Sequence, residues 1–224
     1  MRTNDVRGGP AVAMRPGPWP GTPIALISVL LLSYLWLWHG TIRGHFFVCV
    51  GLYFAIGAWS HRRRGESASA IGLRLDNIGP ALWWAVKLAG PLFVLPVAIG
   101  AWLGTLQPFA ISAVPGALAW GWLWGTMQQY GLVCVFYRRF REQLGDGWGA
   151  ALAAAGLFAL FHLPNPFLTP VTFVSGIVAC RIYRREPNLL VLGLMHALLS
   201  GVLRQSLGPD ITHHMRVGPG YWEP

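Results

Sequence analysis

Apolar residues occur in long runs along this chain, separated by short polar or charged segments. A helix that crosses a bilayer needs about 20 mostly apolar residues. The pattern therefore predicts helices over residues 22–38, 45–60, 80–104, 116–138, 148–162, 167–183 and 187–204. The fifth and sixth runs are separated at His162–Pro166, where two prolines interrupt helical hydrogen bonding. The predicted fold class is all-α, a polytopic membrane bundle of about seven transmembrane helices.

Composition supports this class. Hydrophobic residues make up 54% of the chain and charged residues 11%, with a mean hydropathy of +0.47. A soluble domain carries roughly 25% charged residues. The three cysteines, Cys49, Cys134 and Cys180, all fall within apolar runs, and their spacing predicts neither a disulfide framework nor a zinc ribbon.

Arginines cluster after every second run. They follow the second, fourth and sixth runs, whereas the loops after the third and fifth runs carry no Lys or Arg and the loop after the first carries only Arg43. The positive-inside rule then places the N-terminus in the cytosol and the C-terminus outside the inner (plasma) membrane. This alternation explains the net charge of +9, so no nucleic-acid partner is expected.

The chain divides into four predicted segments. Residues 1–21 are rich in Pro and Gly and predict a flexible cytosolic tail, and 22–79 hold two N-terminal transmembrane helices and a basic cytosolic linker. The first apolar run is long for a signal peptide and lacks a small-residue cleavage site, so we expect a retained span. Residues 80–204 form the predicted core and 205–224 a C-terminal tail.

Polar side chains interrupt three of the apolar runs. Gln128 and Gln129 lie in the fourth run, His162 ends the fifth, and His196 lies in the seventh. With a rise of about 1.5 Å per residue, Gln128, His162 and His196 lie roughly 15, 21 and 14 Å from the predicted cytosolic boundary. The midplane of a bilayer core lies near 15 Å. The three sites can therefore share one layer, and polar residues at that depth usually mark a functional site.

These residues occur in spaced pairs that resemble the three motifs of the CPBP intramembrane proteases, the family of type II CAAX prenyl endopeptidases and of bacteriocin-processing and self-immunity proteins. The usual patterns are Glu-Glu-x-x-x-Arg, Phe-x-x-x-His and His-x-x-x-Asn or Asp. The corresponding residues here are Gln128-Gln129-x-x-x-Val133, Phe158-x-x-x-His162 and His196-x-x-x-Ser200. The resemblance covers roughly residues 80–204 and implies a membrane-embedded endopeptidase whose substrate is a peptide or transmembrane segment.

The resemblance also implies roles for individual positions. Gln128 occupies the place of the carboxylate that activates water, with His162 as its partner. His196 and Ser200 occupy the oxyanion site. The supporting positions are the Glu–Arg pair, here replaced by Gln129 and Val133, and the aromatic residue Phe158.

The first motif departs from the family in a chemically important way, because a neutral carboxamide cannot act as a general base. No other acid is placed to substitute, since all eight fall in tails or loops: Asp5, Glu66, Asp76, Glu142, Asp146, Glu186, Asp210 and Glu223. Two histidines without a carboxylate or thiolate also make a poor zinc site. We therefore predict neither a metal nor a cofactor.

The replacements are mutually consistent, because losing both members of the Glu–Arg pair leaves no buried charge unpaired. Four readings remain open. The chain is an endopeptidase that uses His162 alone as base, or a pseudoprotease that binds a membrane segment or lipidated tail as an adaptor. The third reading is a small transporter, although no broken-helix repeat supports it. The fourth is that the polar residues only hold helices together by hydrogen bonds. The sequence leaves enzymatic activity undecided.

Overall fold

The computed structural model describes residues 19, 21–38, 45–108 and 114–222. The tail predicted over 1–21 falls almost entirely outside these residues. The regular secondary structure of the described residues is helical, without strands among them. The elements are α1 (Gly21–Ser33) with a π-helical end (Tyr34–Trp38), α2 (His45–Arg63), α3 (Ile78–Leu103), α4 (Val114–Gln129), a π-helical segment (Tyr130–Tyr137), α5 (Arg138–Leu144), α6 (Trp148–Leu160), α7 (Leu168–Arg185), α8 (Leu189–Ser206), α9 (Pro209–Thr212) and two 3-10 turns (His213–Met215, Gly218–Tyr221).

The all-helical prediction is confirmed, and each of the seven predicted runs contains a helix, with differences at three boundaries. The fourth run does not end at residue 138, because α4, the π-helical segment and α5 continue without a break to Leu144. The fifth ends at Leu160, so His162 lies in the following turn. Residues 209–222, predicted as part of a tail, form short helical turns.

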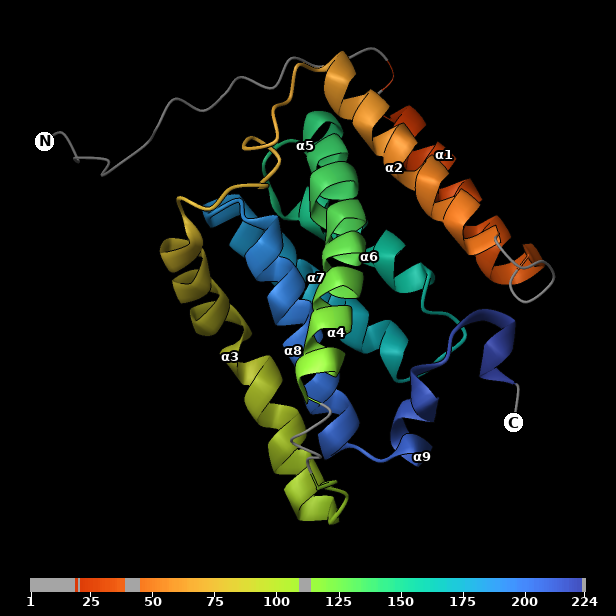
Figure 1. Cartoon of the computed structure of the whole chain (residues 1–224), viewed down its shortest axis with the longest axis vertical. Helices are drawn as coiled ribbons and strands as arrows, with labels where there is room; N and C mark the ends of the chain where they lie inside the picture. Colours follow the sequence, from red (N-terminus) through yellow and green to blue (C-terminus); the bar gives the residue numbers. More distant parts are fainter. Residues whose placement is uncertain (1–18, 20, 39–44, 109–113, 223–224) are drawn as a thin grey trace, which may run out of the picture.

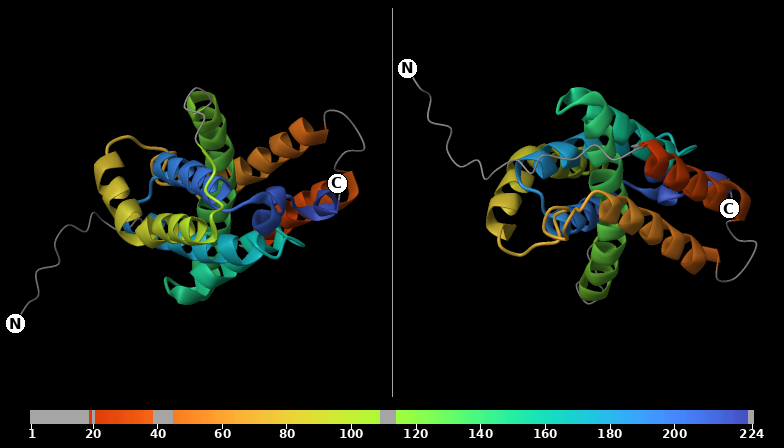
Figure 2. Two further views of the ribbon diagram at one scale, coloured as in Figure 1. Left: turned by 90° about the horizontal axis from the view of Figure 1, so that it is seen from below. Right: turned by 90° about the horizontal axis from the view of Figure 1, so that it is seen from above.

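Helix α4 runs through the middle of the molecule, with α8 beside it (Figures 1 and 2). Helices α3 and α7 pack against α8, and α6 packs against α7. Helices α1 and α2 form a pair to one side of this core (Figure 1). Tyr53 of α2 joins the pair to the centre, because its hydroxyl donates a hydrogen bond of 2.8 Å to the Met127 carbonyl.

Two glycines set the distance between α4 and α8. A β-carbon added at Gly125 would lie 2.7 Å from the Gly193 carbonyl oxygen and 3.0 Å from the side chain of His196. A β-carbon at Gly193 would lie 2.0 Å from Thr126 Oγ1 and 2.9 Å from Thr126 Cα. Small residues let helix backbones approach closely in membrane proteins. These two positions therefore bring Gln129 within reach of His196.

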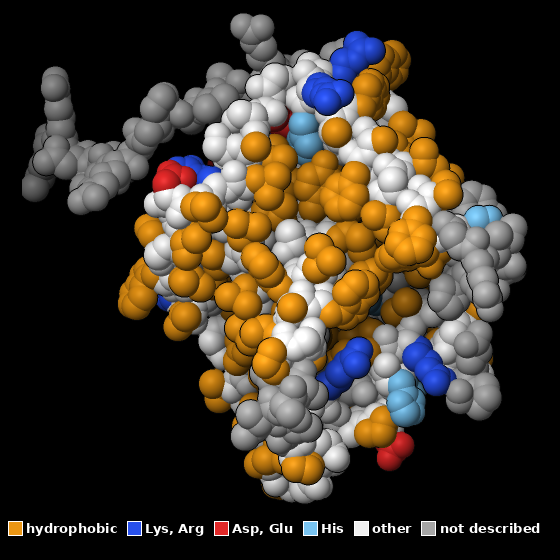
Figure 3. All heavy atoms as spheres, in the orientation of Figure 1, with side chains coloured by type: hydrophobic (Ala, Val, Ile, Leu, Met, Phe, Trp, Pro, Cys, Tyr) orange, Lys and Arg blue, Asp and Glu red, His pale blue; other side chains and the backbone are white. Residues whose placement is uncertain are grey.

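Helix α3 shows the same use of small residues on its inner face, where the buried positions are Ala81, Ala85, Ala89, Pro96 and Gly100. Its outer face is exposed and apolar; Trp83 and Trp102 are 64% and 84% exposed. Large apolar side chains cover much of the face seen in Figure 3. Among the described helices, α3 and α8 are long and apolar enough to cross a membrane.

A buried ion cluster ties the linker after α2 to α5. The Glu66 carboxylate accepts hydrogen bonds of 2.5 Å from both Arg138 and Arg139, and lies 2.6 Å from His61 Nδ1. Arg139 is fully buried and also pairs with Glu142 at 2.9 Å. Burial alone would raise the pKa of Glu66, but the hydrogen bond with His61 and the two arginine charges outweigh it and lower the pKa to about 2. The predicted basic linker is thus anchored to the bundle.

Substituting Gly193 by Ala should destabilise the protein. Overpacking a tight contact costs about 1–3 kcal/mol, and here it exceeds the ~1 kcal/mol that Ala gains over Gly in helix propensity. Gly201→Ala, on the same helix, is the matched control, because a β-carbon there meets nothing within 4 Å. Thermal unfolding of both variants in detergent measures the difference. A Gly193→Ala protein as stable as Gly201→Ala would contradict the close crossing.

Substituting Glu66 by Gln should lower the free energy of unfolding by about 3–5 kcal/mol, because it leaves two arginines without their shared buried partner. Asp76→Asn, which removes the exposed partner of Arg74, should cost less than about 1 kcal/mol. Chemical denaturation of both variants measures the two costs. Equal, small effects would mean that the cluster contributes little.

The same cluster predicts a pH dependence. Below its ordinary pKa of 4.5, Glu66 of the unfolded chain binds a proton that the folded protein does not take up until about pH 2. The stability that Glu66 contributes is therefore fully present above pH 4.5 and is lost as the pH falls to about 2. Denaturation curves of wild type and Glu66→Gln should converge across this range, and a difference that stays constant would contradict the assignment.

Candidate functional site

A cavity of roughly 730 Å³ lies between the α1–α2 pair, α4, α7 and α8. Most of its lining is apolar and aromatic. Besides the tyrosines Tyr34 and Tyr53, the polar side chains that line it are Gln128, Gln129, His162, Thr172, Ser175, His196, Ser200 and Arg204. All of the predicted catalytic residues (Gln128, His162, His196 and Ser200) line this one space, as do Gln129 and Phe158.

The two glutamines reach the cavity from the last turn of α4. Gln129 is 4% exposed, and its Nε2 lies 3.3 Å from His196 Nδ1. Its Oε1 is buried and has no hydrogen-bond partner among the described residues. The amide can turn so that either atom faces the imidazole. In both orientations, one amide atom remains free for a ligand, and a buried polar atom without a partner is costly.

His162 is positioned by the chain immediately before it. Its Nδ1 lies 2.9 Å from the Phe158 carbonyl oxygen, and its ring packs edge-on against the Phe158 ring with centroids 4.8 Å apart. Because a carbonyl only accepts, Nδ1 carries the proton of the neutral ring. The Nε2 atom is then left as a hydrogen-bond and proton acceptor.

Helix α8 contributes a polar face to the cavity. His196 and Ser200 are spaced by four residues and therefore share one side of the helix, as the sequence predicts. Arg204 continues this face by a further four residues and also lines the cavity. In the sequence, the spacing of four residues from His196 to Ser200 and of four more to Arg204 could have placed Arg204 on this face, although Arg204 belongs to none of the three motifs.

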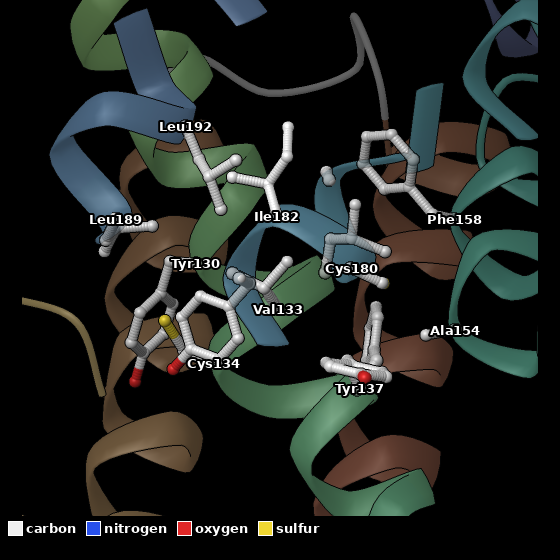
Figure 4. Close-up of a cluster of buried hydrophobic side chains, with 14 of the residues drawn as sticks. Tyr130, Val133, Cys134, Tyr137, Ala154, Phe158, Cys180, Ile182, Leu189 and Leu192 are labelled. Atoms are coloured by element: carbon white, nitrogen blue, oxygen red, sulfur yellow. The ribbon is translucent and has the colours of Figure 1, made fainter. Parts of the chain in front are cut away.

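Val133 is placed differently from the other motif residues. It is fully buried, belongs to the hydrophobic cluster drawn in Figure 4, and is not among the residues that line the cavity. It lies in the π-helical segment Tyr130–Tyr137, whose wider turns alter which positions face the same way. Of the two residues at the positions of the family's Glu–Arg pair, Gln129 therefore lines the cavity and Val133 does not.

Asn165 is a site-supporting residue that the sequence analysis assigned no role. Its Oδ1 accepts hydrogen bonds from the Phe167 and Leu168 amides at the start of α7. Its Nδ2 donates to the carbonyls of Thr212 and Arg216, at 3.1 and 3.0 Å. Asn165 therefore fastens the C-terminal segment beside the His162 turn, and Met215 and Val217 of that segment line the cavity.

Carboxylates are missing from the described lining of the cavity. Glu66 and Glu142 pair with arginines in the cluster beside α5, and Asp146 pairs with Arg141 and Arg184. No group of three His, Cys, Asp or Glu side chains that would suit a metal ion occurs within the described ranges. The arrangement can enclose an apolar ligand and offer it neutral hydrogen-bonding groups.

Comparison with known families agrees with the motif positions. Residues 125–202, roughly a third of the chain, match the family model described as type II CAAX prenyl endopeptidase Rce1-like. All three motifs fall inside this range. No curated protein and no solved structure matches the chain. Over residues 125–202, the chain is therefore similar to the Rce1-like type II CAAX prenyl endopeptidase family.

Proposed function

We propose that this protein is a pseudoprotease of the Rce1-like family, which binds a peptide tail or membrane segment in its cavity without hydrolysing it. One observation carries the proposal: the cavity brings both histidines and both glutamines together, yet no described carboxylate lines it. The scaffold for holding a peptide is kept, while the group that activates water in the family is replaced by Gln128.

The chemistry of Gln128 supports the absence of turnover. A carboxamide can hydrogen-bond to water but cannot accept its proton at biological pH. The carboxylates of the ion cluster, Glu66 and Glu142, are held by arginines of α5 and of the linker after α2 and do not line the cavity. Water that reached Gln128 would be positioned there without being activated.

The size and lining of the cavity support binding. Ligand pockets are commonly 300–1,000 Å³, mostly apolar, with a few convergent polar groups. A cavity of roughly 730 Å³ lined by aromatic and aliphatic side chains fits this description. The free amide atom of Gln129 gains a partner when a peptide backbone enters, which favours the bound state.

The proposed location is the inner membrane, with the N-terminus in the cytosol and the C-terminus outside. The exposed apolar surface and the long apolar helices α3 and α8 support a bilayer environment. Most of the described arginines lie in α5, in the linker after α2 and at the end of α7. By the positive-inside rule, these arginines favour a cytosolic location for the end of the bundle that carries them. On this proposal seven helical segments cross or enter the membrane.

A working endopeptidase is the second candidate, favoured by the tautomer of His162. With Nδ1 donating to the Phe158 carbonyl, Nε2 can take a proton from water. The hydroxide oxygen then bonds to the substrate carbonyl carbon, and His196 and Ser200 donate to the resulting oxyanion. Breaking the C–N bond returns the proton from His162 to the departing amine. Such an enzyme would be slow, because no carboxylate assists the histidine.

Gln128→Glu separates the two candidates. The wild-type protein should show no turnover of quenched apolar and transmembrane peptides in liposomes, whereas Gln128→Glu should hydrolyse at least one of them. A positioned general base contributes about 10²–10⁴-fold to rate. Adding His162→Ala to Gln128→Glu should abolish the gained activity.

Gln107→Glu is the matched control, since it adds a carboxylate at an exposed position outside the cavity and should gain no activity. Wild-type turnover that disappears in His162→Ala would contradict the pseudoprotease proposal and establish the histidine-dependent endopeptidase.

A further inference from the structure

Two cations from separate helices meet on one tryptophan ring at the surface of the bundle. Lys87 Nζ, in α3, lies 5.1 Å from the centre of the Trp84 ring, and Arg185 Cζ, at the end of α7, lies 4.9 Å from the same point. The two charges are therefore no farther apart than the sum of these distances. Elsewhere in the described part of the chain, each ring of this kind carries one cation, as Trp148 does with Arg181.

Neither of these cations is paired with an acid. Within the described residues, Lys87 and Arg185 form no ion pair and no hydrogen bond. The acids closest to them in the sequence are engaged elsewhere, because Asp76 pairs with an arginine of the linker and Glu186 accepts a hydrogen bond from Asn77. Like charges held this close repel each other, most strongly where water is scarce. An anionic group beside the Trp84 ring would relieve this repulsion.

Trp84 lies near the end of α3 that follows the arginine-rich linker. Trp84 and Lys87 come six and nine residues after Ile78, where α3 begins, which is about 9 and 14 Å along the helix axis. Side chains of a helix lean towards its N-terminus, so the Lys87 ammonium reaches back to Trp84 and towards the linker. Long cationic side chains near the ends of membrane helices extend to the headgroup level in this way. Arg185 reaches the same level because it ends α7.

The surface beside the two cations is apolar. Leu82, Trp83 and Val86 of α3 are all exposed. Helix α3 lies at the edge of the bundle (Figure 1), so these side chains would face lipid in a bilayer. A phospholipid carries a phosphate next to its acyl chains and matches this combination of cations and apolar surface. A free phosphate ion would gain nothing from the apolar side chains, so the surface favours a lipid.

We propose that Lys87, Trp84 and Arg185 bind the phosphate group of an anionic phospholipid in the cytosolic leaflet, whose acyl chains lie on the outer face of α3. Basic groups between transmembrane helices on the cytosolic side bind acidic headgroups. The Trp84 ring holds both cations by cation–π contacts and keeps them together at the headgroup level. None of the three residues lines the cavity, so the lipid site is separate from the proposed peptide-binding function.

Native mass spectrometry of the full-length protein in detergent tests the site by measuring the affinity of the first bound lipid. Wild type should bind phosphatidylglycerol about tenfold or more tightly than phosphatidylcholine, whose headgroup has no net charge. Lys87→Gln combined with Arg185→Gln should reduce this preference to about twofold or less, and each single substitution should leave an intermediate preference. Lys87→Arg keeps the charge and should keep most of the preference.

Arg62→Gln combined with Arg63→Gln is the matched control. Both arginines are exposed at the same end of the bundle, and their loss lowers the net charge by the same amount. This variant should keep the wild-type preference; an equal loss in it would assign the preference to the total charge of that end and overturn the site. Thermal unfolding verifies that each variant is folded, and the single substitutions carry the test if the double variant is unstable.

The remaining outcomes also decide the proposal. Equal binding of the two lipids by wild type, or a preference that survives the substitution of both Lys87 and Arg185, would overturn it. Excess inorganic phosphate should leave the binding of phosphatidylglycerol unchanged. Displacement of the lipid by inorganic phosphate would identify a site for the free ion and overturn the lipid assignment. Each result is independent of whether a peptide enters the cavity, so failure of the lipid site leaves the proposed function standing.

Discussion

Helices α4 and α8 cross so closely at Gly125 and Gly193 that neither position has room for a β-carbon. This crossing lies within one turn of Gln129 and His196, and it holds the two side chains 3.3 Å apart. The cavity forms beside the crossing, where larger side chains line the space between α4, α7, α8 and the α1–α2 pair. Backbone proximity at two glycines thus determines which polar groups can meet.

The polar groups of the bundle fall into two layers with different electrostatics. At the arginine-rich end, Glu66 and Glu142 balance arginines of α5 and the linker, so burial is compensated by opposite charge. In the cavity, the glutamines and histidines are neutral hydrogen-bonding groups. Placing Gln129 and Val133 where the family has Glu and Arg removes two buried charges together, which explains how the site persists without its ion pair.

Much of this arrangement follows from the sequence, because apolar runs and prolines determine where helices begin and end. The depths of Gln128, His162 and His196 in their helices predicted that the three can share one layer, whereas their position on one cavity depends on how the helices pack. The continuation of the central helix into α5 was not predictable from the local sequence, since the buried arginines of α5 depend on the distant Glu66 for charge compensation. The C-terminal segment was missed because its anchor is the side chain of Asn165, and no local pattern reports such a contact.

The central claim is that a peptide occupies this cavity, and photo-crosslinking tests it most directly. A peptide that carries benzophenone, which inserts preferentially at methionine, would be irradiated with the protein in nanodiscs, and the modified residues identified by mass spectrometry. Met127, Met195 and Met215 all line the cavity. The account predicts modification at these three, suppressed by excess unlabelled peptide. Modification confined to the outer surface of α3, or none that unlabelled peptide suppresses, would contradict it.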